Sequence, residues 1–200
     1  MKPRTTTSDA NYTNWLKRQE SLWWKRLLDV QRPYRRHLLS LDLGFVLDVG
    51  CGLGRNLNNL AGKGVGVDHN PDSVASVRAR GYTAFLPDEF LASEYGRPGR
   101  FDALLFSHVA EHMHFAEARD LVARYLPFLR VDARVVLITP QEMGFRSDPT
   151  HIEIFNFEAL TRLASELGLE VEKHYSFPFP RFVGHLFKYN EFVLLARKRT

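Results

Sequence analysis

The 200-residue sequence has a single cysteine, Cys51, and no long apolar run. One cysteine cannot form a disulfide within the chain, which is typical of proteins from a reducing compartment. No apolar stretch approaches the roughly 18 residues that a membrane span needs. Residues 1–7 carry charge with no apolar stretch behind it, so they do not resemble a signal peptide. These absences predict a cytoplasmic protein without a membrane partner.

Internal repeats and low-complexity segments are also absent, and the hydrophobic share of 44% is that of an ordinary globular protein. A chain of this length forms one domain more readily than two. The net charge of +4 is uneven, because residues 1–40 hold nine Lys or Arg and three Asp or Glu. This basic segment is either a solvated helix face or a docking site for an anionic molecule.

Short apolar runs predict buried strands, and segments with helical apolar spacing predict helices between them. The predicted strands are residues 45–49, 65–67, 82–85, 101–106, 135–138, 169–175 and 192–196. The predicted helices are residues 55–60, 71–80, 88–95, 116–126 and 157–167. Alternating strands and helices predict an α/β fold with a mostly parallel sheet, and the last two strands predict an antiparallel edge.

The N-terminal part of the chain has a different pattern. Residues 15–39 are expected to be helical, with an apolar stripe through Trp23 and Leu27, and Pro33 is expected to break or kink the helix. We therefore divide the single domain into an N-terminal helical cap segment, residues 1–40, and a core, residues 41–200.

The first predicted strand runs into a glycine loop, residues 48–54, with the sequence DVGCGLG. Alternate glycines permit a tight turn and close approach of a ligand. The third glycine comes one residue earlier than in the dinucleotide fingerprint G-x-G-x-x-G, and Arg55 takes its place. Asp48 would repel a pyrophosphate and attract an α-ammonium group. Asp68 ends the second strand, where an acid commonly binds ribose hydroxyls.

Three segments resemble motifs of the class I S-adenosylmethionine-dependent methyltransferases. Residues 46–54 resemble motif I, residues 66–70 resemble the second motif, and residues 101–113 resemble the fourth-strand segment, which often ends in an acid–histidine pair. The resemblance covers roughly residues 40–200. It implies a Rossmann-like three-layer sandwich whose seven-stranded sheet has an antiparallel last strand. It also implies methyl transfer as the activity and S-adenosyl-L-methionine as the cofactor.

The resemblance further implies which positions contact the cofactor. The glycine loop would pass under the methionine part, and Asp68 would bind the ribose. Asp88 is ambiguous, because an acid there also suits the positive end of a helix. The cofactor-binding residues predicted in this way are Asp48, Gly50, Cys51, Gly52, Gly54, Asp68, His69, Asp88, Ser107 and His108.

Two histidines are candidates for a general base, which a hydroxyl acceptor often needs. His112 follows the fourth predicted strand beside Glu111, and His151 lies in the loop after the fifth. Both loops are expected to converge on the acceptor site, and Asp148 is expected to orient His151. A purely structural role is the alternative for each histidine. Asp148, His151 and Glu111 are also conceivable ligands of a divalent metal, but their spacing is not diagnostic, so no metal is assigned.

The acceptor is constrained mainly by exclusion. Cys51 belongs to the glycine loop, so no cysteine remains as the nucleophile of a cytosine C5 methylase. Residues 107–110 read Ser-His-Val-Ala, unlike the Asn-Pro-Pro-Tyr-like run of amino-group methylases. We therefore predict O-methylation of a small molecule, such as a sugar or polyketide hydroxyl.

Other acceptors and activities stay open at this point. An RNA or protein acceptor would dock on the basic N-terminal residues, so nucleic acid is disfavoured without being excluded. A regulatory cofactor-binding protein and a nicotinamide oxidoreductase are further alternatives. The early third glycine of the loop disfavours the oxidoreductase. The basic residues of the docking hypothesis are Lys17, Arg18, Lys25, Arg26, Arg35 and Arg36.

Overall fold

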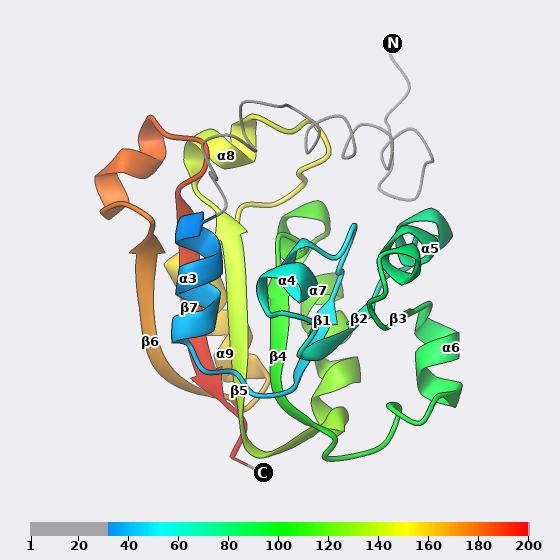
Figure 1. The fold of residues 1–200 in the computed structure, drawn as a ribbon. Helices are drawn as coiled ribbons and strands as arrows, with labels where there is room; N and C mark the ends of the chain where they lie inside the picture. The colour runs from blue at the N-terminus through cyan, green and yellow to red at the C-terminus, as the bar shows by residue number, and fades with distance from the viewer. Residues whose placement is uncertain (1–31, 200) are drawn as a thin grey trace.

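The computed structural model describes residues 32–199, and a seven-stranded sheet runs through this part of the chain (Figure 1). The strand order is β3-β2-β1-β4-β5-β7-β6. Strands β1 to β5 are parallel, whereas β7 is antiparallel to both of its neighbours. The strands are β1 Val46–Val49, β2 Gly64–Val67, β3 Ala84–Phe85, β4 Phe101–Ser107, β5 Leu129–Pro140, β6 Glu170–Phe177 and β7 Glu191–Arg197. The predicted mostly parallel sheet with an antiparallel last strand is confirmed.

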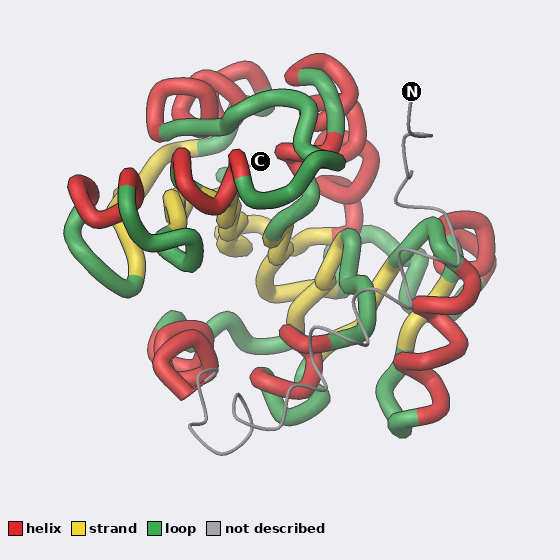
Figure 2. Tube along the Cα trace, turned by 90° about the horizontal axis from the view of Figure 1, so that it is seen from above, coloured by secondary structure: helices red, strands yellow, loops and turns green. Residues whose placement is uncertain are grey.

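Helices cover both faces of the sheet, so the described residues form three layers (Figure 2). Apolar residues of α3, α4 and α5 pack on one face, and those of α6, α7 and α9 pack on the other. The predicted Rossmann-like sandwich is thereby confirmed. The α-helices are α3 Arg32–Ser40, α4 Arg55–Asn59, α5 Pro71–Ala79, α6 Pro87–Ala92, α7 Phe115–Tyr125, α8 Glu142–Arg146 and α9 Phe157–Glu166. None of the helices within residues 32–199 is long and apolar enough to cross a bilayer.

Most of the predicted N-terminal helix lies outside the described residues, including the stripe through Trp23 and Leu27. The described part is α3, in which Pro33 occupies the first turn. A proline is tolerated there because the first amides of a helix have no partner within the helix.

The chain order places a crevice at the carboxyl end of β1. From β1 the chain passes to β2 on one side and reaches β4 on the other, so the connections diverge at this point. Ligands of open α/β sheets bind at such a switch point. A cleft lies here, lined among others by Tyr34 of α3, Arg55 and Asn56 of α4, Ser107 of β4 and Glu191 of β7.

Candidate active site

The glycine loop follows β1 and adopts a conformation that suits glycine. Gly50, Gly52 and Gly54 have φ angles of 75°, 51° and 73°, in the left-handed region. A Cβ atom on Gly50 would lie 2.3 Å from the Val109 side chain, whereas one on Gly52 would meet no atom within 4 Å. The loop is therefore packed tightly against the end of β4 at Gly50 and leaves open space beside Gly52.

Asp68 joins the end of β2 to the glycine loop. Its carboxylate accepts hydrogen bonds from the Gly52 amide at 2.8 Å and from the Asn70 amide at 2.9 Å. Ionised carboxylates have about four acceptor positions, so acceptor capacity remains for ribose hydroxyls. His69 is exposed beside it, with Nδ1 3.7 Å from Asp68 Oδ1. The geometry is compatible with the predicted ribose-binding role of Asp68.

Asp48 is fully buried in β1 and has one unpartnered oxygen. The Asn56 amide donates to Oδ1 at 3.3 Å, while Oδ2 has no hydrogen-bond partner within residues 32–199. Burial raises the pKa of Asp48 to about 7, although the bond from Asn56 opposes the shift. A buried acceptor of this kind calls for a donor. Asn56, the partner of Asp48, lines the cleft, and the predicted contact of Asp48 with a ligand ammonium group stays a prediction.

The remaining predicted cofactor positions differ in their surroundings. Burial raises the pKa of the Cys51 thiol, and its side chain packs in the core with Leu57 and Val74. Any contact of Cys51 with a cofactor would therefore come from its backbone. Asp88 is exposed in the first turn of α6, as the helix-start interpretation expects. Ser107 is buried and lines the cleft.

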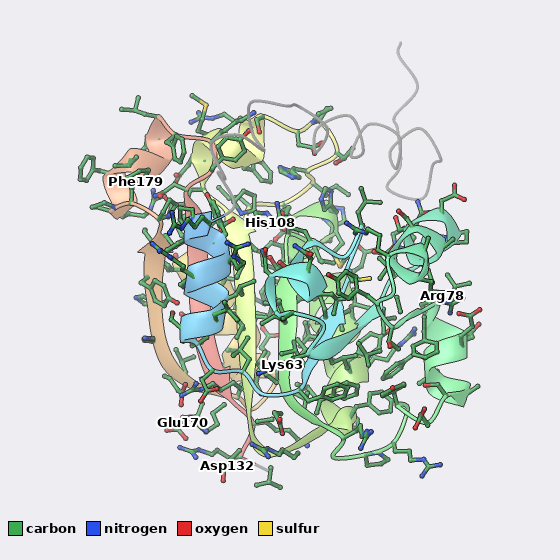
Figure 3. The ribbon with its side chains drawn as sticks, viewed as in Figure 1. Lys63, Arg78, His108, Asp132, Glu170 and Phe179 are labelled. Carbon is green, nitrogen blue, oxygen red and sulfur yellow. The ribbon has the colours of Figure 1, made fainter. Side chains whose placement is uncertain are left out.

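His108 lies between two carboxylates at the end of β4. Its Nδ1 is 3.2 Å from Glu111 Oε1 and its Nε2 is 2.8 Å from Glu191 Oε1. Burial alone would lower the pKa of His108, but these two bonds raise it to about 9. Figure 3 shows His108 at the end of the sheet opposite Asp132. The imidazolium thus connects β4 to β7, and no pattern in the sequence indicated Glu191 as its partner.

His112 and His151 lie side by side, with ring centroids 4.8 Å apart. The structure therefore brings together the loops that follow β4 and β5. His151 Nδ1 is 2.8 Å from the Phe145 carbonyl, which can only accept, so this nitrogen carries the proton. In the tautomer with this proton the lone pair is on Nε2, which lies 4.0 Å from Glu111 Oε1.

Asp148 has a different partner from the one predicted. The expectation that it orients His151 is wrong, because its side chain accepts from the Thr150 hydroxyl at 2.7 Å. Thr150 Oγ1 in turn lies 3.1 Å from His112 Nδ1. The hydroxyl proton points to Asp148, so His112 Nδ1 donates to Thr150 and the lone pair of His112 is on Nε2. Asp148 thus positions His112 through Thr150, while the Phe145 carbonyl holds His151.

Glu111 occupies the centre of this cluster. It is fully buried, and its Oε2 has no hydrogen-bond partner in the described part of the chain. Burial alone would raise the pKa of Glu111, but the bond and the charge of His108, together with His112 and a backbone hydrogen bond, outweigh it and lower the pKa, so the group is ionised. Its carbonyl accepts from the Ile152 amide at 2.7 Å, which ties the loop after β5 to the segment after β4.

The fold and the site together define a class I methyltransferase framework. The glycine loop follows β1, acidic side chains lie in β1 and at the end of β2, and an acid–histidine pair follows β4. A sequence model described as a methyltransferase domain matches residues 29–174. The chain therefore belongs to this methyltransferase family. The predicted family, enzyme class and cofactor, S-adenosyl-L-methionine, are confirmed, and the chain requires a methyl acceptor.

Several solved structures share the fold. A SAM-dependent methyltransferase from Archaeoglobus fulgidus has 20% identity and a TM-score of 0.67, over 88% of this chain and 98% of that one. The magnesium protoporphyrin IX methyltransferase of Synechocystis PCC 6803, solved with bound SAH, has 13% identity and a TM-score of 0.63, over 96% of each chain. A SAM-dependent methyltransferase from Methanosarcina mazei has 17% identity and a TM-score of 0.59, over 77% of this chain and 92% of that one. Among curated proteins, no sequence matches this chain.

Proposed function

We propose that this methyltransferase acts on a hydroxyl group of a small molecule and that His112 or His151 removes the hydroxyl proton. The observation that supports the proposal is the pair of adjacent imidazoles whose Nδ1 protons are already committed to hydrogen bonds. In this tautomer each ring has its lone pair on Nε2, where it can act as a base. His112 follows β4, whose last residue is Ser107 of the cleft, and His151 follows the neighbouring strand β5.

The cofactor supplies the methyl group. A hydroxyl proton moves to an imidazole Nε2, the oxygen forms a bond to the methyl carbon, and the sulfur keeps the electrons of the broken bond. The products are the methyl ether and S-adenosylhomocysteine. Burial lowers the pKa of His112, although Glu111 opposes the shift, so this ring is neutral at physiological pH. A general base is worth on the order of 10²–10⁴ in rate.

Alanine substitution of each histidine tests the proposal. Methyl transfer from labelled S-adenosylmethionine to a panel of sugar, phenol and polyketide hydroxyls is measured for wild type, His112→Ala, His151→Ala and the double variant. We expect kcat to fall by about 10²–10⁴ in the variant that lacks the base. Exposed His114 provides the matched control, and His114→Ala should retain activity. Unchanged turnover in the double variant, with S-adenosylhomocysteine still bound, would contradict the proposed base.

The second candidate acceptor, RNA or protein, depends on the basic N-terminal residues. Arg35 and Arg36 are exposed on α3. Lys17, Arg18, Lys25 and Arg26 lie outside the described residues. If RNA docks on these cations, its affinity should fall steeply as salt rises, because counterions are released on binding. RNA binding that is insensitive to salt would exclude this docking mode.

A further inference from the structure

One ligand atom from each of Glu111, His112 and His151 lies within 4.8 Å of the other two. Two imidazoles and one carboxylate are a known ligand set of catalytic zinc, which keeps a fourth position open for water or substrate. Imidazole nitrogen also suits other first-row divalent metals. The two histidines come from different loops, held together by the bond from the Ile152 amide to the Glu111 carbonyl.

In both histidines the ring nitrogen that would face away from a metal has the kind of hydrogen-bond acceptor that metal-bound histidines have. A metal-bound histidine almost always donates its second ring N–H to a carbonyl, a carboxylate or a similar acceptor, which fixes the tautomer. His151 Nδ1 donates to the Phe145 carbonyl, and His112 Nδ1 donates to Thr150, whose hydroxyl donates to Asp148. The lone pairs therefore reside on the two Nε2 atoms.

The unsatisfied oxygen of Glu111 is a second, independent observation. Glu111 is fully buried, and its Oε2 has no hydrogen-bond partner within residues 32–199. Buried polar atoms are nearly always satisfied, so an orphaned oxygen on the carboxylate that lies between the two histidines and His108 indicates a missing cation or donor. His108 bonds the other oxygen, Oε1, at 3.2 Å. A direct bond between Glu111 and His151 is not formed, because Oε1 and Nε2 are 4.0 Å apart.

We infer that Glu111, His112 and His151 form a binding site for one divalent transition-metal ion of the zinc type. Metal bonds of about 2.0–2.2 Å require the three ligand atoms to close by roughly 1 Å. The open position would hold the acceptor oxygen, a role that rests on the proposed function. There the hydroxyl proton leaves to solvent, the oxygen bonds the methyl carbon, and the sulfur keeps the electrons of the broken bond. With the ion bound, the two imidazoles are ligands and not bases, so this inference keeps the hydroxyl acceptor of the proposed function and replaces its imidazole base.

Metal binding is measured directly on the full chain after chelator treatment and dialysis. Zn²⁺ is titrated calorimetrically, and Co²⁺ is titrated by its visible absorption, which reports coordination by the protein. We expect one ion per chain. Affinity should fall at least tenfold in Glu111→Gln, His112→Ala and His151→Ala, while exposed His114→Ala retains it. Absence of stoichiometric binding to wild type, or equal binding by the three ligand variants, would overturn the inference.

Thr150 gives a variant that leaves all three ligands in place. Thr150→Val removes the nearer acceptor of the His112 N–H, the hydroxyl at 3.1 Å, and leaves the Thr150 carbonyl at 3.4 Å. It should weaken metal binding by roughly 10–100-fold, the usual effect of an outer-shell change. Thr150→Ser keeps the hydroxyl and should restore the affinity. If Thr150→Val binds metal as tightly as wild type, the positioning role of Thr150 is wrong.

Two further readouts separate this inference from the proposed function. S-Adenosylhomocysteine titration shows that each variant is folded and that the cofactor site is intact. O-methylation that persists undiminished in chelator, with no metal bound, would refute the metal site and leave the proposed function standing. Stoichiometric metal binding by a protein that methylates none of the hydroxyl acceptors would refute the proposed function and leave the metal site standing.

Discussion

Asp48 lies in the middle of a strand with no solvent contact, and burial raises the pKa of its carboxyl to about 7. A ligand ammonium beside Oδ2 would favour the ionised form and lower this pKa. Binding of S-adenosylhomocysteine near pH 6 should therefore release roughly one proton per chain. Calorimetry in buffers of different ionisation enthalpy measures this number. Asp48→Asn should bind more weakly and release none, and equal proton release by both proteins would contradict the assignment.

The same carboxyl sets a pH dependence of stability without ligand. In the unfolded chain Asp48 ionises near its ordinary pKa of about 3.9, whereas in the folded chain it holds its proton until about pH 7. The folded state thus binds more protons within this window, so its free energy of unfolding falls as the pH rises from about 4 to 7. Urea unfolding across the window measures the slope, and Asp48→Asn should lose this contribution.

Single residues were predictable from the sequence where their role follows from position along the chain. His112 and His151 were found because each follows a strand whose carboxyl end faces the same edge of the sheet. The hydrogen-bond partners of these histidines could not be predicted, because they come from segments that only the fold brings together. Glu191, which binds His108, is 83 residues away along the chain, and the Phe145 carbonyl that holds His151 is a backbone group with no signature in the sequence.

The elements were predicted well where apolar runs are short and end at glycine or a polar residue. Strand β5 is the main exception, since it begins at Leu129 and not at residue 135. Near its start, residues 130–132 are exposed and include the charged Arg130 and Asp132, so they lack the apolar pattern of a buried strand. Helix α8 was missed because five residues are too few to show a helical period. The antiparallel direction of β7 was predicted, but its position between β5 and β6 was not.

The glycine loop gives a prediction that separates packing from ligand contact. Alanine at Gly50 combines a left-handed φ with a clash against Val109, so we expect it to lower the free energy of unfolding by about 2–4 kcal/mol. Alanine at Gly52 faces open space and should cost only about 1–2 kcal/mol. Its methyl group enters the space proposed for the cofactor, so affinity for S-adenosylhomocysteine should fall. Chemical denaturation and calorimetry measure the two effects.

A double variant checks the cause of the Gly50 effect. Val109→Ala removes the side-chain carbons that a Cβ on residue 50 would strike. In that background Gly50→Ala should retain the cost of the left-handed φ but lose the cost of the clash, leaving about 1–2 kcal/mol. If the two substitutions prove additive, contact with Val109 is not the reason for glycine at this position.

At the scale of the whole molecule, α3 packs into the hydrophobic core although it belongs to the predicted cap segment. Leu38 of α3 and Leu41 and Leu43 just after it are buried in one cluster with Val136 of β5 and Val193 of β7. The cleft is likewise assembled from α3, α4, β4, β5 and β7, five elements distributed along the chain. A ligand in this cleft would therefore contact segments from both ends of the described chain.

This arrangement makes a prediction about cooperativity. If residues 1–40 form a cap on a single domain, thermal unfolding of the full chain should show one transition, with equal calorimetric and van't Hoff enthalpies. Saturation with S-adenosylhomocysteine at 100 times its Kd adds about 2.7 kcal/mol, which raises Tm by roughly 5–10 °C for a chain of this size. The whole transition should move together, because the cleft joins elements from both ends of the chain. Two transitions, only one of which responds to the ligand, would mean that the cap unfolds on its own and that the cofactor is held by the core alone.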